Sequence, residues 1–406
     1  MIMTKLILEV TMAVNDKTFE RVRHYTLILI AVLCASIALS CSGDNGGSGI
    51  DGRNSETLRF VFLADSRSDS YGPDPVSPEN FINKDVLGLI VDKILELQPQ
   101  PSFVVFGGDM AYRGRYQHDN TSFYTFHAWK DVMKKLTDAG IPVYTAIGNH
   151  ELYDTHGGTY FLANQTEFQA EFTDNPNNGP AGYERLTYSF TSPKGNSFFA
   201  VLDPYYITED TPQFLDGGID ETQMTWLADQ LARTKATHKF LFIHTPYYYV
   251  SGPSATPDLN YSFTMLWKML DDNKFDLYAC GHSHLYSRKT IDSNVAPYPQ
   301  PYPLLPPWQN NVVQLLNGTC GAPLENDDPK VDRIAWHIFD VHNAPDTYYF
   351  SVVDVNGANT TVNSYGYNSD TKAFSTIDTF SIQKNPSPQI VSQRRKKDKL
   401  TMLVGR

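Results

Sequence analysis

The sequence predicts a layered α/β fold in which short strands end at side chains with oxygen or imidazole donors. Strand-like apolar runs alternate with helical patterns over most of the chain, which is typical of layered α/β proteins. Five of these runs are followed within three residues by Asp, Asn or His. Since open α/β sheets place their sites at the carboxyl ends of their strands, we expect these donors along one edge of a sheet.

The five runs share an apolar, β-rich composition bounded by turn residues, which is the pattern of a buried strand. They occupy residues 60–64, 103–106, 141–147, 240–243 and 277–280. The donors that follow them are Asp65, Asp109, Asn149, His150, His244, His282 and His284. Arg67 and Tyr112 stand close behind two of these donors and are further candidates for the same site.

Four helices are expected between and after these strands, because apolar residues recur there at helical spacing. The four stripes run over residues 81–97, 123–136, 224–231 and 263–270. Asp220 is the expected N-cap of the third helix, since a short acidic side chain can accept from the free N–H groups of the first turn. These apolar stripes are expected to be core.

Beyond His284 the helical spacing ends and strand-like runs follow. They occupy residues 312–316, 334–341 and 348–355, with a Pro-rich segment at 297–307. We expect these late strands to form a second sheet packed on the first. Cys280 and Cys320 either form a disulfide bridge or remain two buried thiols.

Composition excludes one class of function. At 406 residues the chain can hold one large α/β domain or two smaller ones, and its 13% aromatic content favours a packed globule. The formal net charge of −12 argues against a nucleic-acid-binding scaffold, because such proteins need a cationic surface to displace phosphate counterions. A small phosphorylated molecule stays compatible with this charge.

The amino-terminal segment has the pattern of an export signal. Arg21 and Arg23 precede an apolar stretch at residues 25–39 that ends in small residues and Cys41. We expect residues 1–41 to form a signal peptide whose apolar stretch is cut off in the mature protein. Because the stretch is shorter than the roughly 20 apolar residues of a membrane span, a retained anchor helix is the second choice.

Cys41 resembles the lipid-modified cysteine of bacterial lipoproteins, and residues 42–56 resemble their flexible linker. Ala38 stands where such signals prefer a larger aliphatic residue, so ordinary signal-peptidase cleavage is the alternative. The expected location is the bacterial cell envelope or periplasm, with or without a lipid anchor at Cys41, or the medium after secretion. Contact with a membrane is expected only through that anchor.

The remaining chain divides into a catalytic domain, residues 57–385, and a basic tail, residues 386–406, which we expect to be solvated and disordered. We expect a monomer.

The ordered donors resemble the motifs of calcineurin-like metallophosphoesterases over about residues 58–354. The purple acid phosphatase branch is the most similar, because a tyrosine stands three residues after the second aspartate and the first motif lacks a histidine two residues after its aspartate. Arg67 stands there, where that branch usually has glycine. The matching motifs are Asp65, Gly108-Asp109-x-x-Tyr112, Gly148-Asn149-His150-Glu151, His244 and Gly281-His282-Ser283-His284.

This resemblance implies a four-layer α/β/β/α metallophosphoesterase sandwich with two metal ions at the carboxyl ends of its strands. By resemblance, the first ion takes Asp65, Asp109, Tyr112 and His284. The second takes Asp109, Asn149, His244 and His282. The donor chemistry independently favours two cations, since this mixture exceeds one tetrahedral site and a shared carboxylate can bridge two ions.

The expected metals follow from the ligands. A tyrosine binds as phenolate at neutral pH only beside a strongly charged cation, which favours Fe(III) at the first site. Imidazole and amide ligands suit Zn, Mn or Fe(II) at the second. The alternative for Tyr112 is an aromatic side chain that only packs beside the site.

His150 and Arg67 are the two candidates for direct contact with substrate. By resemblance, His150 faces the substrate, where it hydrogen-bonds a phosphoryl oxygen or protonates the leaving alcohol. The alternative is a histidine that only orients a ligand, and Glu151 is expected to hold His150 or a neighbouring ligand. Arg67 either grips a phosphate oxygen or forms a salt bridge at the rim with Asp69 or Asp74.

The predicted reaction is hydrolysis of phosphate monoesters by a hydroxide whose pKa the metals lower, attacking phosphorus in line with the leaving group. Diesters and nucleotides are alternative substrates for the same metal pair. From another class of function, the chain could be a surface-tethered protein that binds metal without turnover.

Overall fold

The computed structural model describes residues 57–68, 81–118, 121–153, 161–208, 217–248, 261–295, 307–324, 341–343 and 346–384. All of them belong to one compact unit of the chain, residues 51–406. The expected signal peptide, the linker and the basic tail lie outside the described residues, and these three expectations stay predictions. Among the described residues no helix combines the length and apolar character that a membrane crossing requires.

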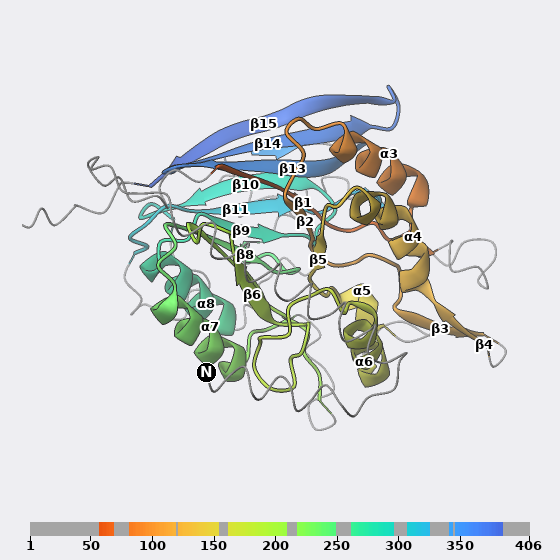
Figure 1. Cartoon of the computed structure of the whole chain (residues 1–406), viewed down its shortest axis with the longest axis horizontal. Helices are drawn as coiled ribbons and strands as arrows, with labels where there is room; N and C mark the ends of the chain where they lie inside the picture. The colour runs from red at the N-terminus through yellow and green to blue at the C-terminus, as the bar shows by residue number, and fades with distance from the viewer. Residues whose placement is uncertain are drawn as a thin grey trace, which may run out of the picture. The chain divides into compact units, whose positions relative to one another are not determined.

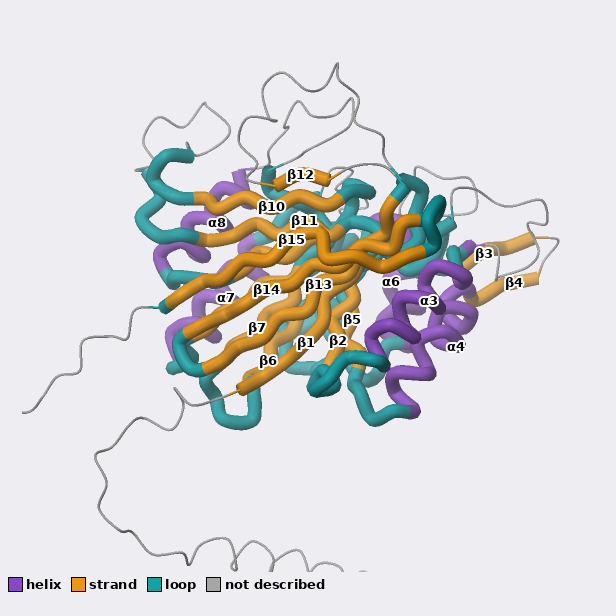
Figure 2. The backbone as a smooth tube through the Cα atoms, turned by 90° about the horizontal axis from the view of Figure 1, so that it is seen from above, coloured by secondary structure: helices purple, strands orange, loops and turns teal. Residues whose placement is uncertain are grey.

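Two sheets form the centre of the unit (Figures 1 and 2). The first has the order β15-β14-β13-β1-β2-β5 and the second β12-β10-β11-β9-β8-β7-β6. The strands of the first are β1 (Thr57–Leu63), β2 (Phe103–Phe106), β5 (Val143–Thr145), β13 (Thr347–Asn356), β14 (Asn359–Asn368) and β15 (Ala373–Gln383). Those of the second are β6 (Tyr188–Thr191), β7 (Ser197–Val201), β8 (His238–Phe242), β9 (Leu277–Cys280), β10 (Tyr286–Ile291), β11 (Val312–Asn317) and β12 (Val341–Asn343).

Within each sheet the strands nearest the site run parallel. β1 pairs with β2 and β2 with β5, and in the second sheet β7, β8, β9 and β11 are neighbours in parallel register. Their carboxyl ends therefore point the same way within each sheet. β3 (Arg115–His118) and β4 (Thr121–Tyr124) form a separate hairpin between β2 and the next helix.

Three apolar clusters show that the layers are helix, sheet, sheet and helix. In β1, Phe60 and Phe62 pack between the two sheets, whereas Val61 and Leu63 face the cluster under the helices of the first sheet. This alternation follows from the period of two in a strand that is covered on both faces. Phe60 meets Phe240 of the other sheet at 5.1 Å between ring centroids. The predicted four-layer α/β/β/α architecture is confirmed.

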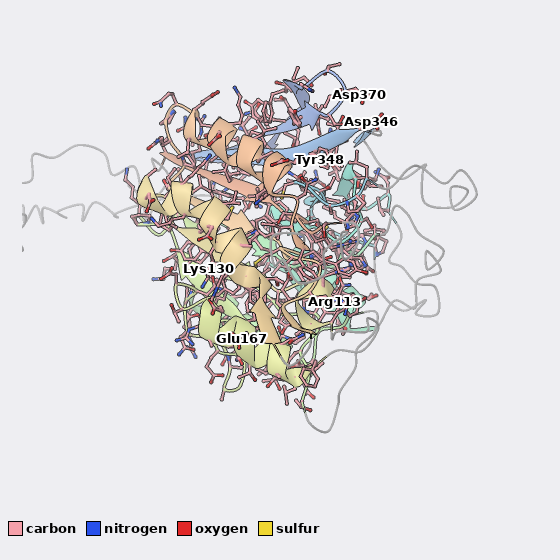
Figure 3. The ribbon with its side chains drawn as sticks, turned by 90° about the vertical axis from the view of Figure 1, so that its right-hand side faces the viewer. Arg113, Lys130, Glu167, Asp346, Tyr348 and Asp370 are labelled. Atoms are coloured by element: carbon pink, nitrogen blue, oxygen red, sulfur yellow. The ribbon has the colours of Figure 1, made fainter. Side chains whose placement is uncertain are left out.

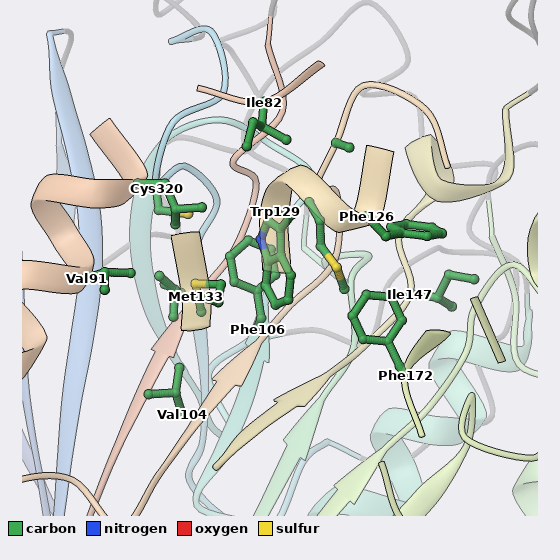
Figure 4. Close-up of a cluster of buried hydrophobic side chains, with 14 of the residues drawn as sticks. Ile82, Val91, Val104, Phe106, Phe126, Trp129, Met133, Ile147, Phe172 and Cys320 are labelled. Atoms are coloured by element: carbon green, nitrogen blue, oxygen red, sulfur yellow. The ribbon is translucent and has the colours of Figure 1, made fainter. Parts of the chain in front are cut away.

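The helices form the outer layers. The helices over the first sheet are α3 (Lys84–Leu95) and α4 (Thr125–Asp138), and those over the second are α7 (Glu221–Arg233) and α8 (Tyr261–Asp272). Figure 4 shows the cluster under α3 and α4, where Trp129 and Met133 of α4 meet Phe106 of β2. Two short helices, α5 (Asn149–Leu152) and α6 (Leu162–Glu171), follow β5. Lys130 of α4, labelled in Figure 3, ties α6 to α4 through a 2.7 Å ion pair with Glu171.

The expected helices and strands are confirmed with shifted ends. Asp220 caps α7 by accepting a hydrogen bond from the backbone N–H of Gln223, as predicted. Phe123, expected in a helix, lies in β4 instead, because the β3–β4 hairpin precedes the first turn of α4. The run at 141–147 forms only the three residues of β5. Residues 334–340 lie outside the described residues.

The expected division of strands between sheets is wrong. The late strands do not form a separate second sheet, because β13, β14 and β15 extend the first sheet beside β1, and β10 to β12 extend the second. The strands that carry the donors are also divided, with β1, β2 and β5 in the first sheet and β8 and β9 in the second. The site therefore lies where the edges of two sheets meet, and not along one edge.

Candidate metal centre

Two clusters of potential ligands form at the carboxyl ends of the strands. One consists of Asp65, Asp109 and His284, and the other of Asp109, His244 and His282. In each cluster one donor atom per residue lies within 4.8 Å of the others. Asp109 belongs to both clusters, which makes its carboxylate the only side chain that the two sets share.

Three of these residues adopt the left-handed backbone region that side chains other than glycine rarely occupy. The φ angles are 60° at Asp65, 53° at Asp109 and 74° at His282. Such conformations cost on the order of 1 to 3 kcal/mol each and persist only where the surroundings impose them. Here the N–H of Asp65 donates to the carbonyl of Gly108 at 3.0 Å, and the N–H of His282 donates to Oδ2 of Asp65 at 3.1 Å.

The motif glycines leave room for the carboxylates. A Cβ on Gly281 would overlap Oδ2 of Asp65, and a Cβ on Gly148 would overlap Oδ1 of Asp109. Backbone and carboxylate therefore approach so closely that only glycine fits. These glycines allow each ligand carboxylate to reach the loop of a neighbouring strand.

Glu151 holds the backbone around Asp109. It is fully buried, and its carboxylate accepts from the N–H groups of Asp109 and Met110 at 2.8 Å and of Gly148 at 2.7 Å. The expectation that Glu151 holds a neighbouring ligand is confirmed for Asp109, through the backbone. Burial nevertheless raises the pKa of Glu151 to about 7, with the nearby charge of Asp109 adding to the effect.

The hydrogen bonds of two histidines direct their Nε2 atoms to the clusters. Nδ1 of His244 donates to the carbonyl of Gly107 at 2.8 Å, and Nδ1 of His284 donates to the carbonyl of Pro323 at 2.7 Å. A carbonyl only accepts, so these bonds place the proton on Nδ1 and direct Nε2 toward the carboxylates. Nε2 of His244 is buried, lies 3.3 Å from Oδ1 of Asp109 and has no hydrogen-bond partner among the described residues. Such an orphaned nitrogen fits a metal ligand.

Asn149 and His282 face each other as two ligands of one ion would. Oδ1 of Asn149 lies 3.0 Å from Nδ1 of His282. With metal–ligand bonds of about 2.1 Å, two ligand atoms on one ion lie about 3.0 to 3.5 Å apart. The two atoms are therefore as far apart as two ligands of one cation would be. Oδ1 of Asn149 and Nδ1 of His282 thus fit the predicted second site.

The buried carboxylates of the two clusters also favour a positive charge between them. Burial raises the pKa of Asp65 well above its usual value, against the opposing charge of His244. Although burial opposes it, the charges of His244 and His150 hold the pKa of Asp109 well below its usual value. Burial lowers the pKa of His244, but Asp109 and Asp65 outweigh it and raise that pKa to about 9. A proton on His244 thus supplies part of the charge that a cation would supply.

Arg67 lies at the first cluster. Its Nη2 is 3.4 Å from Nε2 of His284, and its Nε is 3.7 Å from Oδ2 of Asp109. Nη1 donates to the carbonyl of Ser68 at 3.0 Å, and Nε has no hydrogen-bond partner among the described residues. Asp69 and Asp74, the expected rim partners, lie outside the described residues. The guanidinium therefore faces the ligands themselves.

His150 and Tyr112 lie together beside Asp109. Nδ1 of His150 donates to the carbonyl of Tyr112 at 2.9 Å, and its Nε2 lies 4.0 Å from Oδ2 of Asp109. Burial lowers the pKa of His150 to about 4. The centroid of the Tyr112 ring is 5.2 Å from that of the His150 ring, 5.7 Å from Cζ of Arg67 and 5.4 Å from Cζ of Arg113. The structure thus places Tyr112 beside the site, while both interpretations of its hydroxyl stay open.

Tyr153 is a residue of the site that the sequence analysis missed. Its hydroxyl accepts a hydrogen bond from Nδ2 of Asn149 at 3.1 Å, and its ring lies 4.8 Å from that of His150. Its position four residues after Asn149, at the C-cap of the short helix α5, was the available sign.

Residues expected to lie apart from the site do so where they are described. His238 is buried and hydrogen-bonded to Asp276 and to the carbonyl of Gly357, and the largely exposed His127 pairs with Glu171. Tyr247 and Tyr248 pack against Trp267 of α8 in the apolar cluster under α7 and α8. Cys280 and Cys320 are buried free thiols, so the disulfide alternative is wrong. The side chains of His118, His156, Tyr249, His337, His342 and Cys41 lie outside the described part of the structure.

Comparison with known proteins gives one family. A family model described as calcineurin-like phosphoesterase matches residues 58–286. Tartrate-resistant acid phosphatase type 5 of Rattus norvegicus is 23% identical over 240 residues, which is 56% of this chain and 67% of that protein. A purple acid phosphatase from yellow lupin (Lupinus luteus) seeds aligns at a TM-score of 0.52 and 18% identity, covering 81% of this chain and 54% of that one. This chain thus spans about half the length of the lupin chain.

Because the family model matches more than half of its residues, the chain belongs to the calcineurin-like phosphoesterase family. The predicted resemblance to this family and to its purple acid phosphatase branch is confirmed. Vps29 of Chaetomium thermophilum also aligns, at 9% identity and a TM-score of 0.32.

Proposed function

We propose that the chain is a hydrolase of phosphate monoesters that works with two metal ions held by the two ligand clusters. The observation that carries this proposal is the position of Asp109, whose carboxylate belongs to both clusters. A shared carboxylate is the usual bridge between ions about 3.5 to 4 Å apart. The phosphatases of rat and lupin to which the chain is similar support the same class of reaction.

The ligands favour particular metals. The first site would use Asp65, Asp109 and His284, and Tyr112 would join it as a phenolate. A tyrosine binds as phenolate beside a strongly charged cation, which supports Fe(III) as the first ion. Asn149, His244 and His282 suit Zn, Mn or Fe(II) at the second.

When bound, such a pair supplies an activated water nucleophile and neutralises charge on the phosphoryl group. The side chains position the substrate. Arg67 has N–H groups next to the first cluster and a side chain only 14% exposed, so it can hold a phosphate oxygen through charge-assisted hydrogen bonds. Phosphate would then replace the contacts of Arg67 with His284 and Asp109.

His150 is the second substrate residue in this proposal. Because its Nδ1 proton is committed to the carbonyl of Tyr112, Nε2 is the atom available to a phosphoryl oxygen or to the leaving alcohol. The lowered pKa means that Nε2 gains a proton only in acid solution or once the negative charge of a substrate is present. His150 therefore serves as a hydrogen-bonding partner and, when protonated, as the acid that protonates the alcohol.

We also propose that this activity is located outside the cytosol, in the envelope or periplasm or after secretion, because residues 1–41 have the pattern of an export signal. Radiolabelled palmitate incorporation that is lost in Cys41→Ala would support lipidation. A protein that matures without label would support plain cleavage.

The test of function is metal content together with hydrolysis by the purified protein. We expect two metal ions per chain and hydrolysis of an aryl phosphate monoester that exceeds hydrolysis of the matching diester and is lost with a chelator. Preferred hydrolysis of the diester would replace the monoester assignment. Two bound ions without any turnover would favour the metal-binding protein, and His150→Ala would then change nothing measurable.

A further inference from the structure

We propose that Tyr153 is a positioning residue that orients the side-chain amide of Asn149, so that its oxygen and not its nitrogen faces the second metal site. The inference deepens the proposed two-metal function and rests on it. An asparagine amide is nearly symmetric in shape, and only its oxygen can bind a cation. Something must therefore distinguish its two ends.

The hydrogen bonds of Asn149 place its two ends in different surroundings. Nδ2 donates to the hydroxyl of Tyr153 at 3.1 Å, while Oδ1 lies 3.0 Å from Nδ1 of His282. Asn149 is 5% exposed, so bulk water has little access to either end of the amide. The hydroxyl of Tyr153 therefore faces the amide nitrogen of Asn149, and the amide oxygen faces His282 of the second cluster.

Tyr153 is itself held in place from two sides. Nδ2 of Asn164, a residue of α6 that is 1% exposed, donates to the backbone carbonyl of Tyr153 at 2.7 Å. The Tyr153 ring lies edge-on to the His150 ring, with 4.8 Å between centroids and 80° between planes. A chain of contacts thus runs from α6 through Tyr153 to Asn149 and the second site. The same ring contact places Tyr153 next to the proposed substrate residue His150.

The direct test is the metal affinity of Tyr153→Phe, which keeps the ring and removes only the hydroxyl. Loss of a group that orients a metal ligand lowers affinity by roughly tenfold to a hundredfold. We expect a decrease of this size at the second site, measured by competition with a chromophoric Zn chelator, with the first site unchanged. Tyr183→Phe is the matched control, because its hydroxyl bonds to Asp220 and not to a ligand.

A double-mutant cycle separates orientation from a general structural effect. In Asn149→Asp either carboxylate oxygen can bind the ion, so orientation no longer matters. We therefore expect Tyr153→Phe to lower affinity in the wild-type background and to leave it unchanged in the Asn149→Asp background. An equal loss in both backgrounds, or no loss in either, would overturn the proposal.

Thermal unfolding of each variant checks that it is folded. If Tyr153→Phe does not fold, Asn164→Ala replaces it in the same cycle, because it removes the bonds to the carbonyls of Leu152 and Tyr153 that hold Tyr153 against Asn149. The proposed function is judged separately, by metal content and turnover of the wild-type protein. Failure of the Tyr153 proposal would thus leave that function standing.

Discussion

Nη2 of Arg67 lies 3.4 Å from Nε2 of His284, so a permanent side-chain cation faces a nitrogen of the proposed first metal site. The Nδ1 proton of His284 is committed to the carbonyl of Pro323, which leaves Nε2 as an acceptor. Arg67 and a metal ion would therefore compete for the lone pair on Nε2 of His284. A metal ion held by His284 would replace this contact, and a phosphate would then be a suitable new partner for the guanidinium.

Replacement of Arg67 tests this relationship. Arg67→Lys keeps the charge and loses the planar pair of donors, so we expect kcat/KM for an aryl phosphate to fall by about a hundredfold. Affinity for inorganic phosphate as a competitive inhibitor should fall as well. A variant with unchanged kcat/KM and inhibition would show that Arg67 only forms a salt bridge.

Asp109 should control both metals at once. Asp109→Asn keeps the size and tolerates the left-handed backbone, but it removes the charge that both clusters share. We expect the affinity for both ions to fall by more than about tenfold, measured as metal content after dialysis against a weak chelator. Asp203→Asn, which replaces a buried carboxylate outside the clusters, is the matched control. Loss of one ion alone would contradict the shared role.

The glycine before His282 should be essential for the first cluster. In Gly281→Ala the new Cβ would overlap Oδ2 of Asp65 and come within 2.8 Å of Cβ of Ala64. We expect a loss of about 1 to 3 kcal/mol in the free energy of unfolding, together with weaker binding at the first site. Gly88→Ala is the control, because nothing lies within 4 Å of its Cβ position in α3, and it should stabilise by about 0.5 to 1 kcal/mol. If both substitutions changed the free energy of unfolding equally, the expected overlap between a Cβ at position 281 and Asp65 would be refuted.

Asp203 should make stability depend on pH. It is fully buried, Oδ1 accepts from the N–H of Tyr205 at 2.8 Å, and Oδ2 has no hydrogen-bond partner among the described residues. Burial raises its pKa to about 7 in the folded state, so the folded protein keeps a proton that the unfolded chain releases near pH 4. Its contribution to stability is therefore largest below about pH 4 and is lost as the pH rises to about 7.

Asp203→Asn removes this titration and keeps an acceptor for Tyr205. The difference in unfolding free energy between wild type and variant should shift in favour of the variant by a few kcal/mol from pH 4.5 to 7.5, measured by urea denaturation. Other titrating groups cancel in this difference. A difference that stays constant over this range would mean that Asp203 is ionised in the fold at low pH.

Tyr112→Phe decides the role of the tyrosine. If the hydroxyl binds Fe(III) as phenolate, the wild-type protein should show a visible phenolate-to-iron absorption band that disappears in the variant, with iron content lowered. If Tyr112 only packs beside His150, both proteins should have the same spectrum and metal content. Arg113→Lys is a control for the neighbouring charge, because its Cζ lies 5.4 Å from the centroid of the Tyr112 ring.

Local patterns in the sequence determined much of this protein. The apolar runs of β2 and β9 were predicted to the residue, and the cap of α7 at Asp220 was predicted with its helix. The positions of the donors at the ends of their strands were predicted, and so was the family to which the chain belongs. These features depend on neighbours in the chain, such as the period of a strand or the free N–H groups of a first turn, and such information is contained in a short window of sequence.

Only the tertiary structure decided how these parts meet. It placed β8 and β9 in a different sheet from β1, and it brought Tyr153 and Asn164 behind Asn149 and the carbonyl of Pro323 behind His284. It also left Cys280 and Cys320 as separate thiols. These relationships join segments that are distant in the chain or depend on how side chains turn within the packed fold. A strand buried on both faces has the same apolar sequence in either sheet, so pairing and packing, and not local pattern, determine which residues support the site.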